Sequence, residues 1–351
     1  MIQIIQDGFN DIFSRFFRLR PIRLVLYITH RCNSRCIMCS IWKEKVEKEL
    51  FFDDYKMLFS NDFLKRIRYV TISGGEACLR NDLAEIIGLL IKNNPKIKKI
   101  NLATNALNPN LTTPQIKKVG EVLKDKNIKF VIQISVDALD ETDDKIRGIS
   151  NASSKILLTI DQLKDMQKIY PFLKLSLVCL IQPLNITKLD SMLNYFLKEN
   201  VDFLFTVVTY SKSYYENLDT DAIRFNNTQR GIAIKFLEKL SLNNSYNIGK
   251  RFLYYELAEM LKGKKQKRGC PMLRENLALE SDGRVIPCIN TEPLFYGNIK
   301  DNSLSRIWRN RKTRDTIFQI RKEFCPNCMS ACGISILNVS WFWLKSFLKD
   351  F

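Results

Sequence analysis

The run Ile28-Thr29-His30-Arg31-Cys32-Asn33-Ser34-Arg35-Cys36-Ile37-Met38-Cys39 places three cysteines at the spacing C-x3-C-x2-C. It follows the apolar run Leu24-Val25-Leu26-Tyr27-Ile28, which predicts a buried parallel strand. Three thiolates on one loop can hold three irons of a 4Fe–4S cube and leave the fourth iron open to a substrate or cofactor. A zinc site is the alternative, but it needs a fourth ligand nearby, and the single histidine, His30, is expected to point away along the strand exit.

Apolar, β-rich runs alternate with amphipathic segments after this motif. Strands are expected at residues 24–29, 69–73, 99–103, 129–136, 173–181 and 203–208, and helices at residues 82–92, 113–124, 156–168 and 186–199. Six β-α units in order predict an α/β protein whose parallel sheet has right-handed crossovers. The loops that bind cofactors lie at the carboxyl ends of such strands, which is where the cysteine motif falls.

Polar residues also follow the second and third expected strands. Gly74, Gly75 and Glu76 come after the second strand, where two glycines let the backbone approach a ligand closely and Glu76 offers a carboxylate to an ammonium group. The third strand ends in Thr104 and Asn105. We expect these residues at the same sheet edge as the cysteines.

The fourth strand ends in Ser135 and Asp137, with Arg147 ten residues after the aspartate. A guanidinium matches a carboxylate in a two-point hydrogen bond, so Arg147 indicates a ligand carboxylate. The alternative is an ion pair with Asp143, four residues earlier on a helix. Asn185, after the fifth strand, is a further candidate for a polar contact with a ligand.

Taken together, these motifs resemble the radical SAM superfamily over roughly residues 20–210. The resemblance implies a partial (β/α)6 TIM-like barrel and a 4Fe–4S cluster whose open iron is chelated by S-adenosylmethionine (SAM). It further implies that Glu76 contacts the SAM amino group, that Ser135 and Asp137 lie near the ribose and methionine moiety, and that Arg147 meets the carboxylate. Met38 stands where the family often has an aromatic residue, and its thioether can pack against the adenine.

Five cysteines gather near the end of the sequence, at Cys270, Cys288, Cys325, Cys328 and Cys332. Asp-Gly at residues 282–283, between apolar alternations, predicts a hairpin that brings Cys288 to face Cys270. Four thiolates could bind zinc as well as an iron–sulfur cluster, but the first motif favours iron.

The pattern C-x12-G-x4-C…C-x2-C resembles the SPASM/Twitch extension of radical SAM enzymes. The resemblance implies a small C-terminal domain with one auxiliary 4Fe–4S cluster held by Cys270, Cys288, Cys325 and Cys328, and Cys332 could replace Cys328. The expected organisation is an N-terminal amphipathic segment (1–20), the core barrel (21–210), a helical linker (211–265), the auxiliary cluster domain (266–337) and an aromatic, basic tail (338–351).

The composition indicates the cellular compartment and the kinds of partner. The chain has 351 residues, 46% of them hydrophobic, and a net charge of +18. Cysteines at metal-ligand spacing favour a reduced cytosol, and no secretory signal or membrane-spanning run is evident. The charge suits an acidic low-potential electron donor of the flavodoxin or ferredoxin type, and the two ends could contact the inner face of the membrane. No basic block is dense enough to favour nucleic acid.

The sequence therefore predicts an oxygen-sensitive enzyme that cleaves SAM reductively and takes a hydrogen atom from its substrate. That substrate is a peptide, a sugar or other small metabolite, or a lipid precursor. The rival is a zinc-stabilised nucleic-acid-binding protein, which would be colourless and would bind RNA in a salt-sensitive way. The rival hypothesis does not explain why these polar residues gather at one edge of the sheet.

Overall fold

The computed structural model describes residues 20–44, 48–212, 214–266, 270, 272, 275–291 and 294–330. Nearly all of the expected N-terminal segment, the whole tail at 338–351 and Cys332 lie outside these residues. No helix in the described part of the chain is long and apolar enough to cross a membrane.

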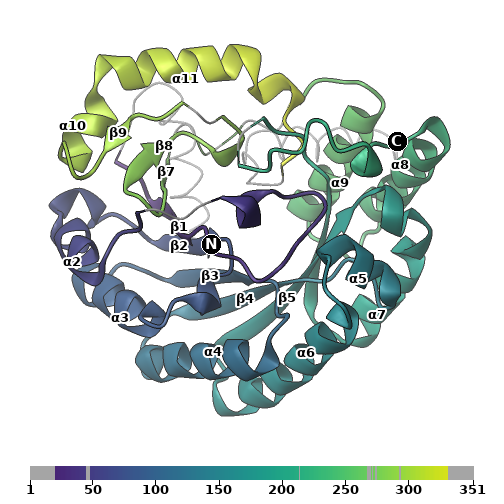
Figure 1. Ribbon diagram of the computed structural model, residues 1–351, viewed down its shortest axis with the longest axis horizontal. Helices are drawn as coiled ribbons and strands as arrows, with labels where there is room; N and C mark the ends of the chain where they lie inside the picture. Colours follow the sequence, from purple (N-terminus) through teal and green to yellow (C-terminus); the bar gives the residue numbers. More distant parts are fainter. Residues whose placement is uncertain are drawn as a thin grey trace.

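One twisted sheet runs through the molecule in the order β6-β5-β4-β3-β2-β1-β7-β8-β9 (Figure 1). Its first six strands are all parallel to their neighbours, as predicted. They are β1 (Arg23–Thr29), β2 (Tyr69–Gly74), β3 (Lys99–Thr104), β4 (Lys129–Ser135), β5 (Leu173–Ile181) and β6 (Asp202–Val207). The sheet does not close on itself, which confirms the open, TIM-like barrel.

Helices cover the outer face of the six parallel strands (Figure 1). They are α3 (Leu83–Asn93), α4 (Pro109–Leu123), α6 (Ala152–Ile169) and α7 (Leu189–Lys198), with α2 (Phe52–Ser60) and α5 (Glu141–Arg147) beside them. Helix α4 begins earlier than expected because Pro109 fits the first helical turn, where its missing N–H costs nothing. Helices α8 (Asn227–Leu242) and α9 (Ile248–Leu261) make the segment after β6 largely helical.

The C-terminal cysteine-rich segment extends the same sheet. Strand β7 (Asn276–Leu279) pairs in parallel with β1, so that Leu26 lies opposite Leu279, and β8 (Arg284–Ile286) returns antiparallel to it. Gly283 adopts φ +92° in the turn, which confirms the predicted hairpin. Strand β9 (Gly297–Asn298), α10 (Leu304–Arg309) and α11 (Arg311–Glu323) follow. This pairing brings the second cysteine group to the side of the first.

Candidate functional site

The cysteine loop, residues 32–39, leaves β1 at its carboxyl end and lies against the turn after β2. Gly75 N donates to Thr29 O at 2.7 Å and Glu76 N donates to Arg31 O at 2.8 Å. A Cβ atom at Gly75 would lie 2.2 Å from Arg31 O, and one at Gly74 would lie 2.2 Å from Thr29 O. The two glycines were expected to admit a ligand. Here they admit the backbone that leads into the cysteine loop.

The C-terminal end of α5 holds the middle of the loop. Arg35 N donates to Arg147 O at 2.8 Å and Ile37 N donates to Ile146 O at 3.0 Å. Gly148 caps α5 at φ +62°, and a Cβ atom there would lie 2.7 Å from Arg35 O. The packing of the loop on α5 therefore requires a glycine at position 148.

A segment that the sequence did not single out covers the end of the loop. Asn217 Nδ2 donates to Met38 O at 2.8 Å and to Thr209 O at 3.0 Å, while its Oδ1 accepts from Ser211 N. Ser40 N donates to Tyr215 O at 2.9 Å. Residues 209–217 thus connect the end of β6 to the third cysteine, and nothing in their composition indicated it.

Replacing Asn217 with alanine should loosen the cysteine loop. The side chain is 1% exposed, so its removal leaves Met38 O, Thr209 O and Ser211 N without their partner, at a cost of about 2–3 kcal/mol. Urea unfolding should show this loss, and a chelator should remove iron faster than from the wild type. Asn302→Ala, at an exposed position, is the control, and equal iron release from both variants would contradict the assignment.

Polar side chains contact two of the three cysteine sulfurs. Asn105 Nδ2 donates to Cys32 Sγ at 3.7 Å, and Ser34 Oγ and Arg147 Nη1 lie 2.9 and 3.9 Å from Cys36 Sγ. Burial is the main cause that raises the pKa of Cys32 to about 11 and that of Cys39 to about 12, and the neighbouring Cys36 contributes to both shifts. Such thiols lose their protons when metal binds, so metal binding and the charge state of the loop are coupled.

Glu76 joins β2 to β3 beside the first cysteine. Its Oε1 accepts from Thr104 Oγ1 at 2.9 Å and from Cys78 N at 3.1 Å, while Oε2 accepts from Asn105 N at 2.7 Å. Burial raises the pKa of Glu76, although these three donors oppose the shift. Oε2 retains acceptor capacity for an ammonium group because a carboxylate oxygen can accept more than one hydrogen bond.

Arg147 bridges the fourth strand and the cysteine loop. Its Nη2 lies 2.6 Å from Asp137 Oδ2, and its Nε lies 3.7 Å from Asp143 Oδ1. Asn185 Nδ2 donates to Asp137 O and Leu180 O, both at 2.9 Å, so this amide supports Asp137 from behind. Ser135 ends β4, half-buried at the same edge. Of the two roles considered for Arg147, the ion pair with Asp143 is present, but it is buried, and Asp137 is a second and closer partner that the sequence did not indicate.

The environment of the triad fits an iron–sulfur cluster. Among the described side chains, no group of three or more His, Cys, Asp or Glu is placed to hold a single metal ion. A 4Fe–4S cube makes another demand, since each thiolate binds its own iron. Asn105 and Arg147 donate toward two of the sulfurs, and such contacts stabilise thiolate and cluster sulfur.

His30 turns toward the C-terminal hairpin and away from the cysteines. Its Nδ1 lies 2.6 Å from Glu44 Oε2 and its Nε2 lies 2.6 Å from Glu280 Oε2. Burial alone would lower the pKa of His30, but the hydrogen bonds and charges of Glu280 and Glu44 raise it to about 10. The imidazolium therefore connects β1 to the strand that follows it in the sheet, and takes no part in the cysteine site.

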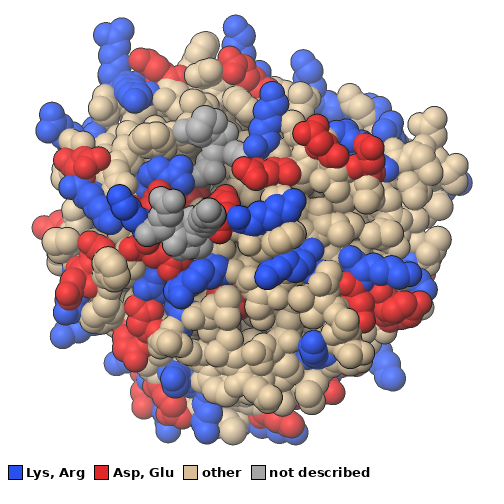
Figure 2. Space-filling model, in the orientation of Figure 1, with Lys and Arg blue, Asp and Glu red and all other residues tan. Residues whose placement is uncertain are grey.

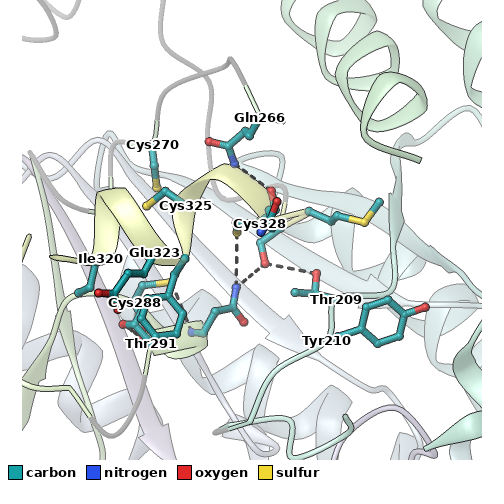
Figure 3. Close-up of a pocket in the computed structure, with 15 residues that line it drawn as sticks. Thr209, Tyr210, Gln266, Cys270, Cys288, Thr291, Ile320, Glu323, Cys325 and Cys328 are labelled. Carbon is teal, nitrogen blue, oxygen red and sulfur yellow. Dashed lines mark hydrogen bonds between the residues drawn. The ribbon is translucent and has the colours of Figure 1, made fainter. Parts of the chain in front are cut away.

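The second cysteine group lines a cavity of about 330 Å³ under α11. Cys270, Cys288, Cys325 and Cys328 all face it, and Figure 3 shows the sulfur atoms of Cys270 and Cys325 close together. Burial, with a smaller contribution from Cys270 and Cys328, raises the pKa of Cys325 to about 12. Four thiols at one cavity are the donor set that a cluster ligated entirely by protein requires.

Two side chains organise this cavity that the sequence analysis missed. Asn290 Nδ2 donates to Cys328 Sγ at 3.7 Å and to Ser330 Oγ at 2.7 Å, and its backbone N donates to Cys288 Sγ at 3.4 Å. Gln266 Nε2 donates to Cys328 O at 2.9 Å (Figure 3). Asn290 could have been found from the sequence, because it is a polar residue two positions after the expected ligand Cys288. Gln266 had no such signal.

One apolar cluster separates the two cysteine groups. It contains Tyr27, Ile41, Tyr214 and Ile286 among its buried members, and Cys32, Cys39 and Cys270 pack against it. Tyr214 Oη also donates to Gly74 O at 2.7 Å. The pairing of β1 with β7 is what makes this shared cluster, because it places the hairpin beside the cysteine loop.

Two protein-family models match the chain. The model of the radical SAM superfamily matches residues 26–190, which include the first cysteine group, Glu76 and Arg147. The model of the SPASM iron–sulfur cluster-binding domain matches residues 270–332, which include the second group. Both matches agree with the division of the cysteines described above.

Curated relatives carry the name GTP 3′,8-cyclase. The protein from Staphylococcus carnosus (strain TM300) is 28% identical over 201 residues, 53% of this chain and 54% of that protein. The protein from Staphylococcus saprophyticus is 31% identical over 159 residues, 41% of this chain and 42% of that protein. The chain thus spans about half the length of the curated relatives it matches.

Solved structures share the fold at low identity. Streptococcus suis SuiB bound to S-adenosylmethionine is 16% identical with a TM-score of 0.62, covering 90% of this chain and 72% of that one. Native anSMEcpe with bound AdoMet is 16% identical with a TM-score of 0.63, covering 94% of this chain and 98% of that one. These neighbours show the architecture of the barrel and its C-terminal extension.

Proposed function

The chain belongs to the radical SAM superfamily, and we propose that it binds SAM at a 4Fe–4S cluster and uses it to remove a hydrogen atom from a substrate. The observation that carries this proposal is the cysteine loop, which is held on three sides at the sheet edge with Glu76 beside Cys32 and Arg147 beside Cys36. No arrangement of this kind is needed by a zinc-stabilised nucleic-acid-binding protein.

Cys32, Cys36 and Cys39 would hold the cluster. When bound, the cluster and SAM supply one-electron cleavage of the sulfonium to a 5′-deoxyadenosyl radical, which takes a hydrogen atom from substrate. The residues around the loop would hold two of the thiolates in place, since Asn105 Nδ2 faces Cys32 Sγ, and Ser34 Oγ and Arg147 Nη1 face Cys36 Sγ.

SAM would be oriented by the groups around this loop. We assign the amino group of SAM to Glu76 Oε2, and its carboxylate to the Nη1 edge of Arg147, which Asp137 leaves free. Thr104 and Asn105 fix the Glu76 carboxylate, and Asn105 also lies close to Cys32.

The remaining contacts follow the sheet edge toward β5. Ser135 and Asp137 lie on the ribose and methionine side of this proposed site. Met38 would pack near the adenine of bound SAM. Asn185 acts on SAM through Asp137, whose carbonyl it holds.

Cys270, Cys288, Cys325 and Cys328 would hold the auxiliary cluster. Because Asn290 and Ser330 lie in the same cavity, the polar groups of this site adjust the potential of the bound cluster. We propose that the cluster exchanges electrons during turnover or binds substrate, and that Cys332 could replace Cys328 as a ligand.

The substrate can be identified by offering candidate compounds to the enzyme. We propose a peptide, a sugar or other small metabolite, or a lipid precursor. GTP is added because curated relatives are named GTP 3′,8-cyclase. A true substrate should raise deoxyadenosine formation above the rate with SAM alone, with deuterium transfer from substrate into deoxyadenosine.

We further propose that the protein works in a reduced cytosol with an acidic low-potential electron donor. None of the nine cysteines in the described part of the chain is in a disulfide, and the net charge of +18 attracts acidic partners. The two ends of the chain could add contact with the membrane, which liposome co-sedimentation with and without residues 338–351 would test.

The deciding experiment is anaerobic reconstitution with iron and sulfide, followed by iron analysis and SAM cleavage with dithionite. We expect about eight irons per chain and release of 5′-deoxyadenosine. Cys288→Ala should lose about four of these irons while the first cluster keeps its spectrum. Zinc in place of iron, with no deoxyadenosine formed, would overturn the proposal.

A further inference from the structure

The surface above the auxiliary cavity has a strong and uneven charge. Helices α10 and α11 carry seven Lys or Arg residues and two acidic ones, and Figure 2 shows basic side chains projecting from the rim where Figure 1 draws these helices. We name this surface the α11 face. Its exposed basic residues are Arg306, Arg309, Arg311, Lys312, Arg314, Arg321 and Lys322.

Four residues on one side of α11 form the centre of this face. Arg311, Arg314, Phe318 and Arg321 follow a spacing of three, four and three residues, which places them on one side of the helix. Phe318 is 73% exposed among these cations. An exposed aromatic ring surrounded by arginines is the composition typical of a protein–protein interface.

The apolar side of α11 packs against the protein core. Thr313, Ile317 and Ile320 are buried against the core, so α11 cannot insert an apolar face into a bilayer. Asp315 lies next to Arg314, so the face offers a partner a carboxylate as well as cations, which suits the mixed charges of a folded protein surface. These features favour a folded acidic protein over a membrane or a nucleic acid.

The far end of α11 leads directly into the cysteine cavity. Ile320, Glu323 and Phe324 line the cavity together with Cys325. A protein seated on the α11 face would therefore lie close to the cysteines of the second group. Electron transfer between two proteins requires their redox groups to lie close together, and this placement would meet that requirement.

We propose that the α11 face is the docking site of an acidic electron-carrier protein of the flavodoxin class. This inference rests on the proposed function, because the carrier serves the cluster that the second cysteine group would hold. In each encounter the carrier's reduced flavin gives up one electron and becomes the semiquinone. The cluster that the second cysteine group would hold accepts that electron.

Binding is the primary test, with an acidic flavodoxin titrated into the iron-loaded protein at about 25 mM and about 300 mM salt. The wild type should bind at low salt and weaken as salt rises. Arg311→Glu/Arg314→Glu should weaken binding at least about tenfold, and Phe318→Ala by about tenfold. Lys117→Glu/Lys118→Glu changes the net charge equally on exposed positions of α4, across the molecule in Figure 1, and should bind like the wild type.

Several results would overturn the docking site. They are no binding by the wild type, unchanged binding by the Arg311→Glu/Arg314→Glu variant, or an equal loss in the α4 control. Binding to anionic vesicles or to RNA that is lost on the same substitutions, without binding of flavodoxin, would assign the face to another partner. Thermal melts of all variants establish that the fold is intact.

Dithionite separates this proposal from the proposed function. A small reductant needs no docking site, so the Arg311→Glu/Arg314→Glu variant should form deoxyadenosine with dithionite at the wild-type rate. Its rate with reduced flavodoxin should fall in step with its affinity. If the wild type forms no deoxyadenosine with dithionite, the proposed function fails, whereas the binding result still decides the docking site.

Discussion

Cys32→Ala/Cys36→Ala/Cys39→Ala is expected to reduce 5′-deoxyadenosine formation to the level of an enzyme-free control. The three thiolates are the proposed cluster's protein ligands, and the polar groups that face them cannot bind iron in their place. Anaerobic reconstitution should leave the variant with about four irons per chain instead of about eight. The remaining iron would belong to Cys270, Cys288, Cys325 and Cys328.

Cys179→Ala is the matched control for this result. Cys179 is buried in β5 and takes part in neither cysteine group, so the variant should keep about eight irons per chain. SAM cleavage that persists in the triple variant at more than trace level would show that the first cysteine loop is not the site of radical initiation.

Arg147→Met should give the largest loss of stability of any single substitution discussed. The guanidinium is 4% exposed and lies between Asp137 and Asp143, and its removal leaves two buried carboxyl groups without a cation. Breaking a buried ion pair from one side costs about 3–5 kcal/mol. Anaerobic urea unfolding of the iron-loaded protein measures this loss.

Arg35→Met provides the comparison for Arg147→Met. Arg35 is on the same loop but exposed, so its replacement should change the free energy of unfolding by less than about 1 kcal/mol. Asp137→Asn in the Arg147→Met background should restore part of the stability, because it removes one of the two unpaired charges. Similar unfolding curves for Arg147→Met and Arg35→Met would contradict the role given to the buried pair.

The sequence by itself determined the strand order of the barrel and the location of the cysteines. Each of the six expected strands lies within one residue of its observed ends, because runs such as Leu173–Ile181 are buried and β-rich along their whole length. The Asp-Gly turn at residues 282–283 likewise identified its hairpin, since a positive φ at Gly283 is a local requirement.

Motif residues were located correctly, but their surroundings were not foreseen. The Gly74-Gly75 pair was expected to admit a ligand, whereas its tightest contacts are with Thr29 O and Arg31 O. His30 points away from the cysteines as expected, but its position between Glu44 and Glu280 was not foreseen. Partners as distant in sequence as His30 and Glu280 leave no local pattern.

Only the tertiary structure decided how the two cysteine groups are related. The pairing of β1 with β7 extends the barrel sheet into the C-terminal segment, and residues 209–217 fold back over the cysteine loop through Asn217. The β1–β7 pairing and the acceptor Met38 O both use backbone groups, which nearly every residue possesses, so side-chain patterns do not specify these partners. Local periodicity therefore fixes which elements form, whereas the competition among long-range pairings fixes where the chemistry is assembled.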